Sequence, residues 1–430
     1  MRGTFRSLAS RNYRIWATGA AVSNVGTWMQ RTAQDWLVLT GLTHHNATAV
    51  GVVMSLQFGP QLLLLPLTGF AADHLDRRRL LFATQTAMGV LALGLGLLTV
   101  TGVVRLWQVY LFALLLGIVA AFDAPARQAF VSELAGEGDL PNAVALNSAS
   151  FNAARLVGPA VAGLLISAVG VGWVFLINAA SYLAVLYSLA RLSTAELHPR
   201  PAAPPDGFRV TDGILYVWRR SDLKALLLML FLLGTFGLNF PIFISTMSVS
   251  TFHIDARHYG LLTSMMAIGS VTGALLAARR PRPTMTLLVG AAALFGVGCG
   301  LAAVMPDYRL FGVALVGVGI AAQTFTASTN GLVQLSTEPA MRGRVMAIHL
   351  AMLLGGTPVG APIVGWIADT LGPRWALGVG ALAGLATAWV GLRYLTVHRG
   401  LRVRIEAGRL RWRRDRADPA APDPSGQPRS

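Results

Sequence analysis

The most constraining feature of this sequence is a repeated alternation between long apolar runs and very short charged connections. The clearest connection is 69–79, which ends in Arg77, Arg78 and Arg79 and lies between the apolar runs 47–71 and 80–102. Each run matches the roughly 20 residues that a helix needs to cross a bilayer. The runs therefore predict two spanning helices joined by a short loop. The three arginines place that loop in the cytoplasm, because positive residues are poorly translocated.

Composition extends this pattern to the whole chain. Of the 430 residues, 54% are hydrophobic and 13% are charged, with a mean hydropathy of +0.57. A soluble chain carries about 25% charged residues. We therefore expect an all-α integral membrane protein with twelve transmembrane helices. The predicted spans are 15–40, 47–71, 80–102, 105–122, 143–169, 172–190, 223–249, 257–278, 284–305, 309–333, 344–369 and 374–396.

The distribution of positive residues predicts the orientation of these helices. The loops that the twelve-span scheme places outside contain one arginine each, namely Arg105, Arg257, Arg309 and Arg374. Most other Lys and Arg residues lie at the opposite ends, in the central loop or in the tail, so both termini are expected in the cytoplasm. The net charge of +16 does not indicate nucleic-acid binding, because the positive residues are not gathered on one soluble domain.

Five segments follow from this scheme. They are a cytoplasmic N-terminus at 1–14, an N-terminal six-helix bundle at 15–190, a cytoplasmic linker at 191–222, a C-terminal six-helix bundle at 223–396, and a basic, partly disordered cytoplasmic tail at 397–430. The linker begins with a proline-rich stretch that breaks any helix. Apolar and charged residues then mix from Phe208 to Arg220, which predicts a short amphipathic helix on the membrane surface; a plain solvated helix is the alternative.

The two bundles are predicted to be related copies of each other. Four pairs share one separation along the chain: Gly158 with Gly360, Gly163 with Gly365, Gly170 with Gly372, and Trp173 with Trp375. This separation aligns span five with span eleven, a shift of six helices. Six is even, so the two halves have the same orientation, as in parallel repeats related by an axis along the membrane normal. A chance match of glycines in glycine-rich helices is the alternative.

The connection after span two carries the first family motif. Gly69, Asp73, Arg77 and Arg78 match the pattern Gly-x-x-x-Asp-(Arg/Lys)-x-Gly-Arg-(Arg/Lys), and the chain in this region resembles the major facilitator superfamily. The match is incomplete, because His74 and Asp76 replace the basic residue and the second glycine of that pattern.

A second motif lies in span five, where Gly158, Pro159 and Gly163 resemble the signature of proton-coupled exporters in this superfamily, with Ala154 and Ala162 in place of two glycines. Small residues let helices approach closely and proline bends a helix, which suits a seam where one half rocks against the other; ordinary tight packing is the alternative. From residue 10 to 396 the chain is similar to the enterobactin-exporter-like and multidrug proton-antiporter-like group.

Span one carries the first candidates for proton coupling. Asn24, Trp28, Arg31 and Asp35 are spaced so that they share one helix face. A charge at bilayer depth costs about 3 kcal/mol, so such residues normally face a cavity or a partner. Burial favours a protonated carboxylic acid and a nearby arginine favours an ionised one, so a moving partner would switch Asp35 between the two forms. A static ion pair between Arg31 and Asp35 is the alternative.

Arg155 is the third coupling candidate. It lies in span five on one face with Asn152 and needs a partner, a hydrated cavity or an anionic substrate group. The arginine that the superfamily usually has in helix four is absent, so the resemblance implies a related role for Arg155; a structural arginine at the interface between the halves is the alternative. The predicted substrate-cavity residues are Asn24, Trp28, Gln34, Asn152, Asn239, Gln323 and Asn330.

The resemblance further implies a cytoplasmic gate that forms when that side is shut. The candidate residues are Gly69, Asp73, Arg77, Arg78, Asp123 and Arg127. We expect Asp73 to cap a facing helix N-terminus and Arg77 to pair with a carboxylate such as Asp123. The alternative is that these charges act only on topology.

The sequence contains no P-loop, metal-ligand cluster or nucleophile–base pair, so we expect neither an enzyme nor a cofactor or bound metal. The resemblance implies a secondary active transporter of the bacterial inner membrane, in which a proton gradient drives efflux of a small amphipathic or siderophore-like compound by alternating access. A proton-coupled importer, a uniporter and a non-transporting scaffold or sensor are the alternatives. The expected partners are the substrate, protons and membrane lipids, without nucleic acid, and we expect a monomer.

Overall fold

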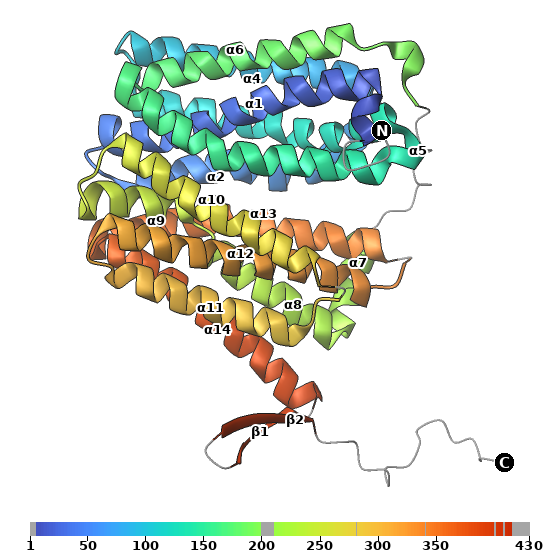
Figure 1. The fold of residues 1–430 in the computed structure, drawn as a ribbon, viewed down its shortest axis with the longest axis vertical. Coiled ribbons are helices and arrows are strands. Elements are labelled where there is room, and N and C mark those ends of the chain that lie inside the picture. Colours follow the sequence, from blue (N-terminus) through green and yellow to red (C-terminus); the bar gives the residue numbers. More distant parts are fainter. Residues whose placement is uncertain are drawn as a thin grey trace, which may run out of the picture.

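The computed structural model describes residues 6–198, 210–280, 282–339, 341–399, 401–406 and 409–414. It consists of two helical bundles lying side by side, the first in blue and green and the second in yellow to red (Figure 1). The elements of the first bundle are η1 (Arg6–Ala9), α1 (Arg11–Trp36), η2 (Leu37–Leu42), α2 (Ala47–Leu63), α3 (Leu65–His74), α4 (Arg77–Val100), α5 (Leu106–Val169), α6 (Val171–Arg191) and η3 (Thr194–Glu196).

The second bundle follows a short connecting helix and ends in a hairpin. Its elements are α7 (Val210–Arg219), α8 (Ser221–Leu232), η4 (Leu233–Gly237), α9 (Phe240–Thr246), η5 (Met247–Thr251), α10 (Ala256–Ala278), α11 (Met285–Val304), α12 (Tyr308–Ser336), α13 (Arg342–Leu371) and α14 (Pro373–Arg399). Strands β1 (Leu401–Glu406) and β2 (Arg409–Arg414) then pair antiparallel, a hairpin that the sequence did not predict. The predicted disorder at 415–430 lies outside the described residues.

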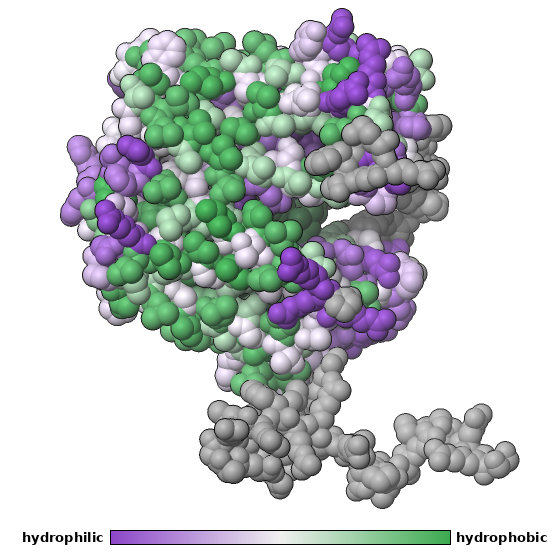
Figure 2. All heavy atoms as spheres, viewed as in Figure 1, coloured by the Kyte–Doolittle hydropathy of each residue, from purple (hydrophilic) through white to green (hydrophobic). Residues whose placement is uncertain are grey.

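The membrane-spanning segments confirm the all-α fold. Ten helical segments in the described ranges are long and apolar enough to cross a bilayer. Helix α1 with η2, and α2 with α3, supply two further segments. The first of these contains Arg31 and Asp35, which lower its hydropathy, and the second is interrupted at Leu64. Hydrophobic residues cover most of the visible surface and hydrophilic residues gather toward its two ends (Figure 2).

Two predicted loops are helical in the structure. The connection 69–79 narrows to residues 75–76, because α3 continues to His74 and Asp76 caps α4 by accepting a hydrogen bond from the Arg79 amide (2.8 Å). Likewise, the region between predicted spans 105–122 and 143–169 belongs to α5, in which two helices meet at a kink at Gly136. These helices extend beyond the apolar stretch, so hydropathy alone underestimated their lengths.

The amphipathic linker helix is present as α7. Gly213 lies against Arg344 of α13, and Val217 is buried, whereas Ile214, Leu215 and Trp218 are exposed. One face of α7 therefore packs on the second bundle and leaves an apolar face uncovered. Most of the proline-rich part of the linker, 199–209, lies outside the described residues.

Two equivalent glycines of the predicted repeat have nearly the same backbone conformation. Gly170 ends α5 with φ of 92° and ψ of 164°, and Gly372 ends α13 with φ of 103° and ψ of 160°. Both values lie in a region that favours glycine, and the two residues are a pair in the sequence repeat. The corresponding helices therefore end in the same way in both halves.

The two halves meet along two seams, α5 against α10 and α13 against α2. A Cβ on Gly163 would lie 2.5 Å from the carbonyl oxygen of Ala256, and a Cβ on Gly365 would lie 2.5 Å from that of Ala47. Ala256 and Ala47 are the first residues of α10 and α2. The seams are therefore equivalent under the repeat, and each depends on a glycine that brings two backbones together.

We use two names for the ends of the molecule. The linker end carries the start of α1 and of α7, and the far end carries the start of α2 and of α10 (Figure 1). Both seam glycines contact the first residues of α2 and α10, so the halves touch most closely at the far end.

Replacing Gly163 with alanine is expected to destabilise the protein, because the new methyl group would press against the α10 backbone. Overpacking of this kind costs about 1–3 kcal/mol, which would appear as a lower Tm of the purified protein in detergent. Gly317→Ala in α12 is the matched control, since nothing lies within 4 Å of a Cβ at that position. Equal Tm values for the two variants would contradict the close seam.

Candidate functional site

A cavity of about 210 Å³ lies between the two halves. From the first half, α1 contributes Trp28, Arg31 and Asp35, and α5 contributes Arg155. The second half contributes aromatic and apolar side chains from the segment around α9 and from α10, among them Phe240, Ile244, Tyr259 and Met266. All three residues predicted to couple protons therefore line one central space, and each contacts the interface between the bundles.

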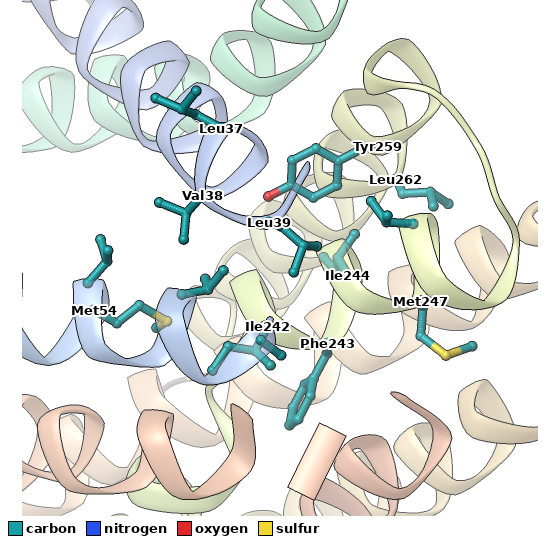
Figure 3. Close-up of a cluster of buried hydrophobic side chains, with 14 of the residues drawn as sticks. Leu37, Val38, Leu39, Met54, Ile242, Phe243, Ile244, Met247, Tyr259 and Leu262 are labelled. Atoms are coloured by element: carbon teal, nitrogen blue, oxygen red, sulfur yellow. The ribbon is translucent and has the colours of Figure 1, made fainter. Parts of the chain in front are cut away.

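The far end of the cavity is closed by an apolar cluster from both halves. Leu37, Val38 and Leu39 of η2 and Met54 of α2 pack with Ile242, Phe243 and Ile244 of α9, Met247 of η5, and Tyr259 and Leu262 of α10 (Figure 3). Val38, Leu39, Ile242 and Phe243 have no measurable exposure. This cluster separates the charged cavity from the far end.

Asp369 adds a polar contact to the closed far end. Its carboxylate, near the end of α13, accepts hydrogen bonds from the amide of Ala47 (2.6 Å) and from the amide and hydroxyl of Thr48 (2.8 and 2.5 Å). These donors form the first turn of α2 in the other half, where unpaired amides and the helix dipole favour an anion. Asp369 therefore joins the halves where they are packed most tightly.

In the described residues, the equivalent seam of α5 against α10 has no carboxylate that bonds across the two halves. The repeat aligns Asp369 with Ser167 of α5, whose hydroxyl donates to the Gly163 carbonyl in its own helix (3.0 Å). Helix α10 is capped instead by its own Asp255, which accepts from the His258 amide (3.0 Å). The carboxylate link across the halves is thus specific to the α13–α2 seam.

Toward the linker end the central cavity adjoins a second one of about 590 Å³. The two cavities share Arg155, Leu238, Phe240 and Met266, and the second is also lined by Gln323, Asn330 and His349. The surface is hollowed between the bundles toward the same end (Figure 2). The arrangement is therefore open toward the linker end and shut at the far end.

The static ion pair between Arg31 and Asp35, which was the alternative to proton coupling, is absent from the ion pairs of the described residues, all of which join atoms within 4.0 Å. The guanidinium lies over the Trp28 ring (5.0 Å from its centroid) and the Phe58 ring (5.6 Å). Asp35 interacts electrostatically with Arg31 on its own helix and with Tyr259 of α10. The i, i+4 spacing allows the pair, but aromatic rings hold the arginine and a tyrosine of the other half engages the acid.

Arg155 crosses the interface. Its Nη2 donates a hydrogen bond to the Ser270 hydroxyl of α10 (2.8 Å), and its guanidinium lies 5.9 Å from the Trp28 ring centroid. Nearby, the Ser264 hydroxyl donates to the Leu156 carbonyl (2.7 Å), so α5 and α10 are joined by two polar contacts. Arg155 is therefore both an interface residue and a cavity residue.

The remaining predicted cavity residues divide into two groups. Trp28 lines the central cavity, and Gln323 and Asn330 line the second one. Asn24, Gln34, Asn152 and Asn239 line neither of these cavities. Asn152 donates to the Ser148 carbonyl of its own helix, and Asn239, which precedes α9, donates to the Thr235 carbonyl of η4. Asn24 accepts from Arg127, and Gln34 is buried.

The gate residues interact within the first half. Arg77 pairs with Glu133 (2.8 Å) in this arrangement. The predicted pairing with a carboxylate such as Asp123 concerns the state in which the linker end is shut, and it stays a prediction. Asp123 instead pairs with Arg127 one turn away (3.0 Å) and accepts from Thr84 and Gln85. Arg77 begins α4 and reaches Glu133 in the part of α5 that lies beyond the predicted span 105–122.

The other gate residues lie nearby. Arg78 donates to the Leu189 carbonyl of α6 (2.9 Å), and a Cβ on Gly69 would meet nothing within 4 Å. Asp73 lies in α3, and its side chain is outside the described part of the chain. The ion pairs and hydrogen bonds described above for Arg77, Arg78, Asp123 and Arg127 lie within the first half.

The motif in α5 has two different neighbours. Gly158 lies against α1, where a Cβ would be 2.6 Å from the Trp28 Cβ, whereas Gly163 lies against α10. The Pro159 carbonyl faces Gly260 of α10, 2.3 Å from the position of a Cβ there. The motif therefore contacts both α1 of its own bundle and α10 of the second bundle.

Several site residues were missed by sequence reasoning. Tyr259, Ser270, His349 and Asp369 come from helices of the second half and act through contacts with the first or through the shared cavity. Asp369 carried a usable signal, since it is a carboxylate at the end of a predicted span. In the described residues no group of three or more His, Cys, Asp or Glu side chains could hold a metal ion.

Comparison with known families decides the class of this two-bundle protein. Residues 2–402 match the family model described as transmembrane secretion effector. The chain belongs to this family of the major facilitator superfamily. Its match spans both bundles and all of the cavity residues above, so the chain is a multi-span membrane transporter, as the motifs predicted.

Two curated relatives are similar over most of their length. The staphyloferrin A transporter of Staphylococcus aureus is 24% identical over 391 residues, which is 89% of this chain and 95% of that protein. The enterobactin exporter EntS of Salmonella typhimurium is 24% identical over 359 residues, 82% of this chain and 84% of that protein.

Solved structures of transporters share the fold of this family member. The nucleoside transporter NupG superposes with a TM-score of 0.67 at 14% identity, covering 89% of this chain and 98% of that one. A D-xylose–proton symporter gives a TM-score of 0.71 at 12% identity, covering 91% and 98%. These similarities establish the fold.

Replacing Asp369 with asparagine is expected to loosen the far end, because a neutral amide is a weaker acceptor for the α2 amides. Hydrogen bonds to a charged group contribute roughly 1.5–3 kcal/mol, enough to shift the population toward a far-end-open state. Spin labels at His45 and Thr370, in a background with Cys299 replaced, would report a longer or broader distance. Ser167→Ala at the repeat-equivalent position should leave the distribution unchanged, and an unchanged distribution in the Asp369 variant would contradict the link.

Proposed function

We propose that this transporter exports a small amphipathic or siderophore-like compound from the cytoplasm, driven by the proton gradient through alternating access. The supporting observation is that Asp35, Arg31 and Arg155 line one cavity between two bundles that is shut at one end and continuous with a wider cavity toward the other. Charged groups persist at this depth when water or a ligand reaches them.

Asp35 is the proposed proton carrier. It is a carboxylate of the central cavity, its neighbour Tyr259 belongs to the opposite half, and Arg31 lies on the same helix. Rocking of the halves changes the distance between Asp35 and Tyr259, while a substrate that engages Arg31 changes the local charge. Each event alters the balance between the protonated and ionised forms of the carboxylic acid.

Alternating access in this proposal uses the two seams. The far end opens when Asp369 releases the first turn of α2 and the cluster around Leu39 and Phe243 separates. The linker end then closes, and the residues Asp73, Arg77 and Arg78 become available to the second half. Packed interfaces of this kind switch between discrete arrangements, which suits a rocking motion.

The distribution of charge and the relatives support the proposed direction of transport and the proposed membrane location. Positive residues concentrate at the linker end, which supports a cytoplasmic location for that end and for both termini in a bacterial inner membrane. One relative is named an enterobactin exporter and another a staphyloferrin A transporter, which supports export and a siderophore-like compound. The proposal includes a monomer that needs no cofactor and contacts lipid headgroups through the exposed apolar face of α7.

Replacing Asp35 with asparagine is expected to abolish proton-driven transport, because asparagine cannot bind and release a proton. The measurement uses inverted membrane vesicles with an acidic interior and a panel of fluorescent amphipathic compounds, with accumulation and proton release recorded together. We expect accumulation by the natural protein and the background of empty vesicles for the variant.

Asp307→Asn is the control, because Asp307 caps α12 outside the cavity and asparagine is an equally good cap. Loss of compound from the vesicles, in place of accumulation, would indicate an importer. Accumulation that needs no pH gradient would indicate a uniporter. Full proton-driven accumulation by Asp35→Asn would remove Asp35 from the mechanism.

A further inference from the structure

Two arginines lie close to one tryptophan in the central cavity. The guanidinium carbons of Arg31 and Arg155 lie 5.0 and 5.9 Å from the centroid of the Trp28 ring. They come from α1 and α5, so the packing of Gly158 against Trp28 sets their separation. The cavity thus presents two planar cations beside an aromatic surface.

Among the described residues, neither arginine forms an ion pair at contact distance with a carboxylate, although Asp35, one turn along α1, interacts electrostatically with Arg31. The ion pairs found among the described residues include neither Arg31 nor Arg155, and the hydrogen-bond partner of Arg155 is the neutral Ser270 hydroxyl. A buried guanidinium without an acidic partner is costly at bilayer depth. The arrangement is therefore incomplete without water or an anion.

The charged residues that line the two cavities also favour an anionic ligand. Among the lining residues of the central cavity Asp35 is the acid, against Arg31 and Arg155. The adjoining cavity adds His349, Gln323 and Asn330 and no carboxylate. The apolar walls strengthen the effect of this excess positive charge, because charge in a low-dielectric cleft is poorly screened. The cleft therefore repels cations and attracts anions.

The remaining lining residues favour a ligand with a flat apolar part. Phe58, Phe240, Ile244 and Met266 line the cavity with the charged groups, and the Trp28 ring lies beside both arginines. Guanidinium groups bind carboxylates and similar oxyanions through two parallel hydrogen bonds and also lie flat on aromatic rings. The site therefore combines an anion-binding fork with an apolar wall.

We propose that the carried compound is an amphipathic anion, whose acidic oxygens are bound by Arg31 and Arg155 and whose planar apolar part lies against Trp28 and Phe240. Binding of the anion replaces the hydrogen bond from Arg155 to Ser270 and thereby loosens a polar contact between α5 and α10. The substrate thus acts on the seam that moves. This proposal deepens the export function above and rests on it for the direction of movement.

A charge series on one scaffold tests the proposal. Purified full-length protein in lipid nanodiscs is dialysed at neutral pH against 2-naphthoate, 2-naphthamide and 2-naphthylmethylamine, which are an anion, a neutral amide and a cation of similar shape. We expect binding of the acid at least about tenfold tighter than of the other two, since it alone engages both arginines. Equal binding of the three, or binding of none, would overturn the proposal.

Variants identify the groups responsible. Arg31→Gln and Arg155→Gln should each weaken naphthoate binding about tenfold, and Arg155→Lys, which keeps the charge but not the fork, should fall between. Arg309→Gln, on the exposed start of α12, should bind as the natural protein does. Unchanged naphthoate binding by both glutamine variants, with intact folding shown by an unchanged Tm, would contradict the proposal that Arg31 and Arg155 bind the anion.

The outcome is separable from that of the export test. If the acid binds in an arginine-dependent manner but no compound moves under a pH gradient, the anion site stands and proton-driven export fails. If the amide or amine is exported under the gradient while the acid neither binds nor moves, export stands and the anion site fails.

Discussion

The close approach of helix backbones at the two seams is the constraint on which the rest of the structure depends. Gly163 against Ala256, and Gly365 against Ala47, bring the halves together at the far end without side chains between them. Because the contact is concentrated there, the bundles diverge toward the linker end and leave the cavities between them. Charged side chains are tolerable in that space because they face a cavity and not lipid.

The far end combines two physically different contacts. The apolar cluster around Leu39 and Phe243 contributes burial, which is favourable but non-directional. Asp369 contributes a directional contact that is satisfied only when α13 faces the first turn of α2. The first keeps water from the charged cavity, and the second fixes the register of the halves. A transporter that must open this end benefits from a few directional contacts that can be broken together.

Much of the fold could be predicted from the sequence, because hydropathy, arginine placement and glycine spacing are local signals. The match of Gly170 with Gly372 anticipated equivalent backbone turns, and the spacing of Arg31 and Asp35 placed both on the cavity side. The side-chain partners seen in this arrangement could not be predicted. Arg77 bonds to Glu133 because α5 extends past its apolar stretch, which hydropathy does not report.

Contacts between the halves were the least predictable part of the site. Tyr259 next to Asp35, Ser270 next to Arg155, and Asp369 on Ala47 all join residues that are distant in the chain. No periodicity within one helix identifies such pairs, and Asn24, Asn152 and Asn239 show that a polar residue in a span often bonds within its own bundle.

The central claim is that the ionisable groups of α1 and α5 face a water-reachable space between two halves that open at one end at a time. Cys299 is buried, and its replacement gives a cysteine-free background in which position 35 or 155 can carry a single thiol. Labelling by a membrane-impermeant thiol reagent, added to one face of the membrane and then to the other, measures access directly. The account predicts that both thiols react from the linker-end face and are protected from the far-end face in the resting protein. Protection from both faces would mean that these groups are sealed in packed helices, and no cavity of the kind described would exist.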